Sequence, residues 1–225
     1  MVFRRMNKVN NIWGNQAVFI TIEGIDGSGK TTQVQKLHER FLAVGKPSMM
    51  TREPGGTPVG DAIRSLLLKP EMDMNSYTEM FLYAASRAEH VRQVIVPALE
   101  NGISVICDRY VDASIAYQGY GLQPEGMTPE LVRMVNEPAV AGCLPDLTII
   151  IDVEVSVAEQ RIGQRKALLQ QNKDRIERRG AAFYERVRQG LKALYEQEPE
   201  RYLWVDGNRS SEELTERIWQ AVTQL

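Results

Sequence analysis

The 225-residue sequence is poor in cysteine and contains no long apolar run, and each shortage excludes a class of protein. Its two cysteines, Cys107 and Cys143, cannot form a disulfide framework, and Cys107 lies in an apolar stretch typical of a buried small residue. No stretch approaches the roughly 18 apolar residues of a membrane span. Residues 1–15 lack the apolar core of a signal peptide. We therefore expect a cytoplasmic protein without a membrane partner, whose residues 1–15 form a flexible extension.

Basic residues are not in excess either. The chain has 27 Lys and Arg against 29 Asp and Glu, a formal net charge of -2, whereas general nucleic-acid binders usually carry strong positive charge. Nucleic acid is therefore not an expected partner. Hydrophobic residues at 43% and charged residues at 25% are ordinary for a globular chain with a real core. We predict a single domain over residues 16–225.

Short apolar stretches alternate with longer segments of helical periodicity. Strands are expected at residues 18–23, 47–51, 103–107, 147–153 and 202–205. Helices are expected at residues 30–44, 59–68, 76–101, 129–140, 157–170, 178–196 and 211–224. This alternation predicts an α/β fold, a five-stranded parallel sheet with helices on both faces. Because the crossovers are right-handed, the carboxyl ends of the strands share one edge, where ligands bind in such sheets.

The stretch GIDGSGKT, residues 24–31, fits the phosphate-loop pattern GxxxxGK[ST] between the first strand and the first helix. Glycines let backbone N–H groups turn inward around a phosphate, and the helix adds its positive N-terminal end. Lys30 is expected to reach the β- and γ-phosphates, and the Thr31 hydroxyl to hold Mg²⁺. The sequence therefore predicts the P-loop NTPase fold. The expected nucleoside triphosphate contacts are Gly24, Ile25, Asp26, Gly27, Ser28, Gly29, Lys30, Thr31 and Thr32.

Polar signatures also follow the second and third predicted strands, as REPGG at 52–56 and DRY at 108–110. Asp108 can face Mg²⁺ or its waters across the sheet edge, although an aspartate in this position can also cap a helix. A GTPase is disfavoured, because the stretch NKDR at 172–175 has arginine where the base-reading NKxD motif has its second carboxylate.

Four stretches resemble thymidylate kinases, and the resemblance runs from about Val18 to the C-terminus: GIDGSGKTT, TREPGGTPVGDAIRSLLL, FLYAASRAEH and DRYVDASIAYQGYG. The second and fourth are specific to that family of P-loop nucleoside monophosphate kinases. The resemblance implies ATP-dependent phosphorylation of dTMP to dTDP by in-line transfer, with Mg²⁺ as cofactor. It also implies a homodimer formed through helices packed side by side.

The resemblance further implies roles on the acceptor side. Tyr83 and Arg87, four residues apart on one helix face, are expected to stack on thymine and to hydrogen-bond it. Arg64 is expected to reach the acceptor phosphate, and Arg109 to bridge the donor and acceptor phosphates. A polar group of the segment SIAYQ is expected to read the thymine edge, with Tyr117 near the sugar. The implied dTMP contacts are Asp26, Arg52, Pro54, Arg64, Tyr83, Arg87, Arg109, Ser114, Tyr117 and Gln118.

Asp26 lies inside the phosphate loop, where a carboxylate is electrostatically unfavourable unless it has a separate task. In the family this position is acidic. The resemblance implies that Asp26 contacts the 3′-hydroxyl of the acceptor sugar or, as a second choice, the shell of the metal ion.

Residues 161–179 are strongly basic in a chain of net charge -2. Such a run is usually a solvated face, but nucleotide kinases place a closing lid after this strand. The phosphate loop contains no arginine, and family members with such a loop carry the catalytic arginine in the lid. Arg165 is the first candidate for this catalytic arginine and Arg175 is the second. Arg161 is expected to contact ATP. The predicted catalytic residues are Lys30, Arg109, Arg165, Arg175 and Asp26, and the predicted metal ligands are Thr31 and Asp108.

Two other functions compete with this interpretation. A deoxynucleoside kinase would phosphorylate a neutral hydroxyl and needs a carboxylate base, so Arg64, Arg87 and Arg109 count against it. A non-enzymatic NTP-binding switch would hydrolyse its nucleotide slowly and would not turn over nucleoside monophosphates.

Overall fold

A computed structural model describes residues 17–170 and 172–225, so the predicted extension at 1–15 lies outside the described residues. Its strands form one parallel sheet in the order β2-β3-β1-β4-β5. They are β1 (Phe19–Glu23), β2 (Ser48–Arg52), β3 (Ser104–Asp108), β4 (Leu147–Asp152) and β5 (Tyr202–Asp206). The predicted five-stranded parallel sheet is confirmed, because every strand begins and ends within one residue of its expected position.

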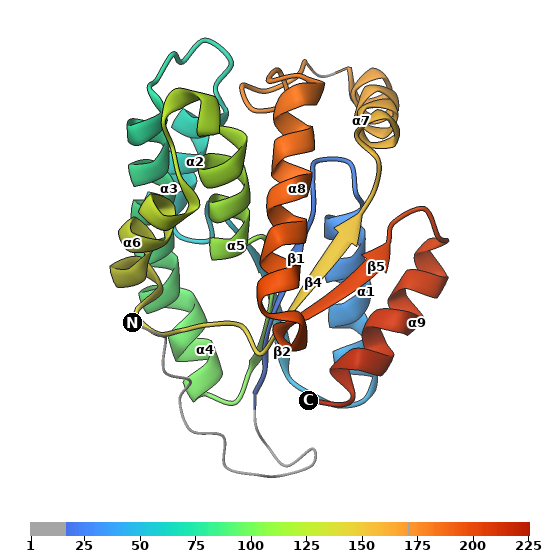
Figure 1. The fold of residues 1–225 in the computed structure, drawn as a ribbon. Helices are drawn as coiled ribbons and strands as arrows, with labels where there is room; N and C mark the ends of the chain where they lie inside the picture. Colours follow the sequence, from blue (N-terminus) through green and yellow to red (C-terminus); the bar gives the residue numbers. More distant parts are fainter. Residues whose placement is uncertain (1–16, 171) are drawn as a thin grey trace.

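Helices cover both faces of this sheet (Figure 1). On one face α1 (Lys30–Ala43) and α9 (Ser211–Val222) pack on Ile20 and Ile22. Phe19 points to the opposite face, which carries the larger part of the core. The remaining helical elements are α2 (Pro58–Leu68), α3 (Ser76–His90), η1 (Val91–Ile95), α4 (Val96–Glu100), α5 (Val111–Ser114), η2 (Ile115–Gly121), η3 (Gln123–Glu125), α6 (Pro129–Val140), α7 (Val155–Leu169), α8 (Ala181–Gln197) and η4 (Pro199–Arg201). None of the helices described is long and apolar enough to cross a membrane.

The register of the sheet brings the carboxyl ends of three strands together. Asp108 at the end of β3 pairs with Ile22 of β1 on one side and with Arg52 of β2 on the other. The segments that leave these strands therefore start side by side at one edge. This edge gathers the phosphate loop, the REPGG turn and the DRY turn, as the sequence predicts.

The short 3₁₀ turns η3 and η4 and one longer helical region were not predicted. Residues 111–121 form α5 and the π-helical segment η2, which lie between α6 and α8. Residues 111–119 are all buried, so the segment has no polar face and lacks the periodicity of an amphipathic helix. Close packing explains its glycines: a Cβ on Gly119 would lie 2.8 Å from the Cα of Pro129, and one on Gly121 would lie 2.5 Å from the Phe183 ring.

Candidate active site

The phosphate loop, residues 24–31, is a tight turn between β1 and α1 that only glycine can complete. Gly24 and Gly27 have φ angles of 145° and 84°, in the region that other residues rarely adopt. A Cβ on Gly27 would lie 2.6 Å from the carbonyl oxygen of Ala158. The first turn of α1 begins at Lys30, so its N-terminal amides border the loop. Backbone amides and a helix N-terminus together make an anion-binding site.

Lys30 is buried beside this loop. Its Nζ donates to the carbonyl oxygen of Ile25 at 2.9 Å. Burial, together with the nearby positive charge of Arg109, lowers the pKa of Lys30 to about 8. Because burial destabilises the charged form of Lys30, a ligand that brings negative charge would stabilise it.

Thr31 and Asp108 meet at the sheet edge, where the Thr31 hydroxyl donates to Oδ2 of Asp108 at 2.7 Å. Hydroxyl and carboxylate oxygens are hard ligands of the kind that Mg²⁺ prefers. Within residues 17–170 and 172–225 no group of three or more His, Cys, Asp or Glu could hold a metal ion. A Mg²⁺ ion here would therefore take its other ligands from phosphate and water, which is its usual habit beside nucleotides. The donor set fits that ion.

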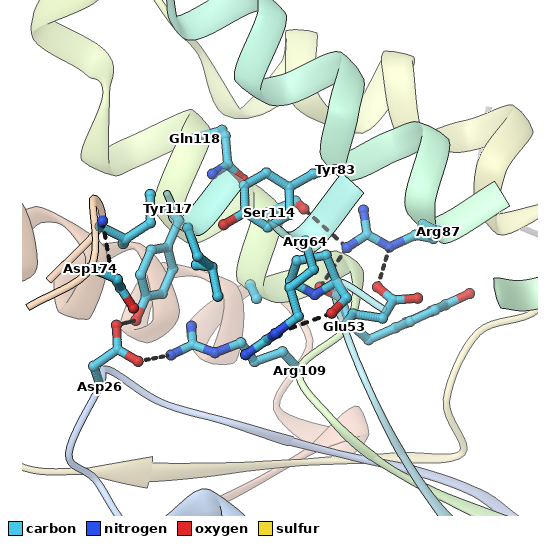
Figure 2. Close-up of a pocket in the computed structure, with 15 residues that line it drawn as sticks. Asp26, Glu53, Arg64, Tyr83, Arg87, Arg109, Ser114, Tyr117, Gln118 and Asp174 are labelled. Carbon is cyan, nitrogen blue, oxygen red and sulfur yellow. Dashed lines mark hydrogen bonds and ion pairs between the residues drawn. The ribbon is translucent and has the colours of Figure 1, made fainter. Parts of the chain in front are cut away.

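Arg109 joins the phosphate loop to the pocket behind it. Its φ of 70° is rare for a side chain of this size and turns the residue back across the sheet edge. The guanidinium lies 2.7 Å from Oδ1 of Asp26 and 4.6 Å from the centre of the Tyr117 ring (Figure 2). Burial alone would raise the pKa of Asp26, but Arg109 and Lys30 outweigh it, and the pKa lies below its ordinary value. Asp26 is therefore an anion in a cationic junction.

A pocket opens beyond this junction, between α2, α3 and η2. All the predicted dTMP contacts except Arg52 line it, and Figure 2 shows their side chains around one space. Arg52 is exposed and lies outside the lining. We call this space the acceptor pocket; its lining is Asp26, Glu53, Pro54, Arg64, Leu68, Tyr83, Arg87, Arg109, Tyr110, Ala113, Ser114, Tyr117, Gln118, Asp174 and Ile176.

Arg87 is almost completely buried in the wall of the pocket, with 1% of its surface exposed. It donates to Oε2 of Glu53 at 2.8 Å, to the Tyr110 carbonyl and Ser114 Oγ at 3.0 Å each, and to Asn136. Because a guanidinium has five N–H groups, these bonds leave one N–H on Nη1. The side chain is thus fixed in place before any ligand arrives.

Arg64 reaches the pocket from α2. Its Nη1 donates to the carbonyl oxygen of Pro54 at 3.0 Å, and burial, with the charge of Arg52, lowers its pKa. Tyr83 enters from α3, and burial, reinforced by Glu79, raises the pKa of its hydroxyl. The two residues give the pocket one cation that lacks an acidic partner among the described contacts, and one aromatic face.

In the segment predicted to form a lid, of which the structure describes residues 161–170 and 172–179, the arginines contact different parts of the site. Arg165 pairs with Glu177 at 3.1 Å and is about half exposed, and its charge helps to lower the pKa of Asp26. Arg175 instead lies 2.6 Å from Oε2 of Glu79 on α3, and its Nε donates to the Leu67 carbonyl at 2.8 Å. Arg165 therefore acts electrostatically on Asp26 in the phosphate loop, whereas Arg175 lies against α3. Arg161 donates to the Gly207 carbonyl at 3.0 Å, beside the loop after β5.

Comparison with known proteins agrees with this geometry. The sequence model of the thymidylate kinase family matches residues 22–218. The chain belongs to the thymidylate kinase family. It is 51% identical over 205 residues to a thymidylate kinase of Exiguobacterium sibiricum, covering 91% of this chain and 93% of the relative. The thymidylate kinase of Deinococcus radiodurans is 42% identical over 210 residues, covering 93% and 98%.

A solved structure is similar as well. The crystal structure of a thymidylate kinase from Ehrlichia chaffeensis matches with a TM-score of 0.71 and 33% identity, covering 93% of this chain and 99% of that one. Family membership confirms the predicted enzyme class, an ATP-dependent kinase, and favours it over the deoxynucleoside kinase and the nucleotide switch.

Several residues of this kinase site carried no signal that the sequence analysis used. Glu53 is buried and accepts from Arg87 and from Nδ1 of His90, at 2.8 and 3.0 Å. Tyr184 of α8 donates to Oδ2 of Asp26 at 3.1 Å, although 158 residues separate the two. Glu79 is fully buried beneath the lid. Only Glu53 could have been found, because it lies within the quoted motif REPGG; the others take part through tertiary contacts alone.

Proposed function

We propose that this chain transfers the γ-phosphoryl group of ATP to the 5′-phosphate of dTMP, at the junction of the phosphate loop and the acceptor pocket. The observation that carries the proposal is that Arg109 and Arg64 line a pocket which shares Asp26 with the phosphate loop. Two arginines suit an acceptor that already carries negative charge. The bond between the γ-phosphorus and the oxygen that bridges the β- and γ-phosphates breaks. A bond from the γ-phosphorus to an oxygen of the acceptor phosphate forms, and the products are ADP and dTDP.

The donor half would be built from the phosphate loop. Its amides and Lys30 would hold the β- and γ-phosphates, and the bound polyphosphate would restore an ordinary pKa to Lys30. Thr31 and Asp108 would hold Mg²⁺, which supplies charge neutralisation of the phosphates when bound. Arg161, held by the Gly207 carbonyl, would border the nucleoside part of ATP.

The acceptor half would bind dTMP between Tyr83, Arg87 and Arg64. The Tyr83 ring would stack on the base, and Arg64 and Arg109 would hold the 5′-phosphate. Asp26 would contact the sugar, with Tyr117 beside it. The acceptor phosphate is ionised at neutral pH, so positioning and charge neutralisation suffice and no strong base is needed.

Residues 161–179 would act as a lid of the single domain, and Arg165 would be its catalytic arginine. Arg165→Ala should lower kcat by about a hundredfold, the scale of one charge-stabilising donor, with little change in dTMP affinity. Arg178→Ala is the matched control, since Arg178 is exposed and its Nε donates to the Lys173 carbonyl, outside the acceptor pocket lining. Unchanged turnover in Arg165→Ala would move the role to Arg175.

We also propose a homodimer. Large apolar side chains are exposed on three neighbouring helices, α2, α3 and α6, and they are Val59, Leu66, Tyr77, Phe81 and Met134. An apolar area spread over adjacent helices is typical of a subunit interface. Sedimentation equilibrium tests it: a dimer is expected, and Phe81→Glu should give monomer. A cytoplasmic location stays a prediction; ATP, the proposed phosphoryl donor, is available there.

One assay tests the proposed activity. ADP release would be followed with ATP and, in turn, dTMP, dUMP, dCMP and thymidine. Rapid release with dTMP and none with thymidine is expected. Release with thymidine alone would indicate a deoxynucleoside kinase, and slow release that no acceptor accelerates would indicate a nucleotide switch.

A further inference from the structure

Glu79 is a fully buried carboxylate that lies outside the lining of the acceptor pocket. It lies on α3, one helical turn before Tyr83, among the side chains that face the lid. Both of its oxygens are engaged, and they are engaged by groups from different parts of the chain. A buried charge with several partners is costly to maintain, so its contacts are informative about what it does.

The Oε1 oxygen of Glu79 accepts from Nε2 of Gln118 at 2.9 Å. The Oε2 oxygen lies 2.6 Å from Arg175 and is also bonded by Arg179. A carboxylate held between two guanidinium groups only accepts hydrogen bonds. The amide group of Gln118 must therefore turn its NH₂ toward Glu79, because the opposite orientation would set two oxygens against each other.

The other end of the same amide has no hydrogen-bond partner among residues 17–170 and 172–225. Gln118 is 1% exposed, and its Oε1 is a buried oxygen that accepts no hydrogen bond from these residues. Gln118 lines the acceptor pocket, and Figure 2 shows it beside the Tyr83 ring. Buried acceptors normally find a donor, so this oxygen is a place for a donor that a ligand supplies.

We propose that Glu79 is a positioning residue that determines base specificity, by fixing Gln118 so that it offers the base a hydrogen-bond acceptor. This inference rests on the proposed function, in which a pyrimidine lies against Tyr83. Thymine and uracil carry N–H at ring position 3 and can donate to Gln118 Oε1. Cytosine carries a bare nitrogen there, so it would face the oxygen lone pairs of Gln118 and leave both groups unpaired.

The decisive comparison is the ratio of kcat/KM for dTMP to kcat/KM for dCMP, in wild type and in Glu79→Gln. A neutral amide at position 79 can either donate or accept a hydrogen bond, so the Gln118 amide can rotate and donate its NH₂ to the bare ring nitrogen of cytosine. In Glu79→Gln we expect the ratio of kcat/KM for dTMP to kcat/KM for dCMP to fall by roughly 10- to 100-fold, the effect of one misplaced polar contact. The ratio of dTMP to dUMP should stay unchanged, because both bases carry the N–H at position 3.

Arg179→Gln is the matched control, because it removes a partner from the same carboxylate but leaves the bond from Gln118 to Glu79. Its turnover can fall through the lid, yet its dTMP to dCMP ratio should equal that of wild type. If Glu79→Gln is unfolded by circular dichroism, Glu79→Asp replaces it. That variant keeps the charge and withdraws it by one methylene, and the ratio should again narrow.

Two results would overturn the inference alone: a wild-type ratio in whichever Glu79 variant is folded, or an equal narrowing in Arg179→Gln. In both cases wild type would still phosphorylate dTMP. If wild type does not phosphorylate dTMP at all, the proposed function fails first, and this inference fails with it.

Discussion

The phosphate loop and the acceptor pocket meet at Asp26 and Arg109, yet the loop offers mainly backbone groups to a ligand and the pocket offers mainly side chains. The loop consists of consecutive residues whose backbone makes the site, and a Cβ on Gly24 or Gly27 would collide with a neighbouring carbonyl oxygen. The pocket consists of side chains from segments far apart in the sequence, held by buried ion pairs such as Arg87 with Glu53. A site made of backbone depends on conformation, whereas a site made of side chains depends on charge and hydrogen bonding.

The variant expected to damage both halves is Arg109→Ala. Arg109 pairs with Asp26 of the phosphate loop and lines the acceptor pocket, so in the proposed mechanism the two nucleotides would meet at this residue. We expect kcat to fall by about a thousandfold, within the range seen for arginines that neutralise phosphoryl transfer. Steady-state kinetics with both substrates measures the effect, and Arg109→Lys should recover part of it. A loss confined to the KM for one substrate would show that Arg109 serves one half only.

The acceptor half alone should respond to Arg87→Lys. Lysine keeps a positive charge beside Glu53 but cannot reproduce the fork that reaches Ser114 and the Tyr110 carbonyl. We expect dTMP affinity to fall about tenfold, the value of one or two lost hydrogen bonds, with ATP affinity unchanged. Isothermal titration measures both, and Arg92→Lys, at an exposed position close by, is the control. Equal losses for ATP and dTMP would contradict the division into halves.

The donor half alone should respond to Gly27→Ala. The new methyl group would lie 2.6 Å from the Ala158 carbonyl, and the loop would have to move. We expect ATP affinity to fall about tenfold or more, because a phosphate site made of amides tolerates little displacement. Isothermal titration with ATP and with dTMP measures both affinities, and only the affinity for ATP is expected to fall.

Gly45→Ala controls for backbone strain in that experiment. Gly45 also has a positive φ, of 72°, but nothing lies within 4 Å of its Cβ position. Its cost to stability should be about 1 kcal/mol, with nucleotide binding unchanged. If both variants lost ATP affinity equally, strain rather than the loop's shape would be the cause.

The contrast between the halves also explains what the sequence could predict. The phosphate loop is a local pattern, so its strand, turn and helix were all placed correctly. Arg64, Tyr83 and Gln118 were expected in the pocket through the family resemblance, and they line it. Arg52 was grouped with them; it is exposed and lies outside the lining, but its charge lies close enough to lower the pKa of Arg64, and its contact with dTMP stays a prediction.

The contacts that hold the pocket together could not be predicted. Glu79 meets Gln118 and Arg179 only in the folded chain, across 39 and 100 residues. No spacing in the sequence connects them. Segment 111–121 was missed for a related reason, since burial on all sides removes the polar face by which a helix is recognised.

The smallest effect on activity is expected from Glu23→Gln. Glu23 lies at the end of β1, where it accepts from the Tyr110 amide at 2.7 Å. Burial, reinforced by Asp112, raises its pKa from 4.5 to about 8, so the folded protein holds it neutral at pH 7 and glutamine is a close substitute. We expect turnover at pH 7 to stay within about twofold.

The pH dependence of the free energy of unfolding should differ clearly between wild type and Glu23→Gln. Above pH 4.5 the unfolded chain releases the Glu23 proton, whereas the folded chain keeps it until about pH 8. Wild type should therefore lose about 2–5 kcal/mol of unfolding free energy relative to Glu23→Gln as the pH rises through that window. Urea unfolding at several pH values measures it. Parallel curves for the two proteins would show that Glu23 is ionised in the folded state.

The central claim is that two nucleotides lie end to end across one edge of the sheet and meet at Arg109. The most direct measurement is calorimetric titration with adenosine and thymidine joined through their 5′ positions by five phosphates. The account predicts one molecule bound per chain and, at saturation, no further binding of either ATP or dTMP. If dTMP still bound to the saturated protein with its usual affinity, the donor and acceptor sites would be separate, and the account would be wrong.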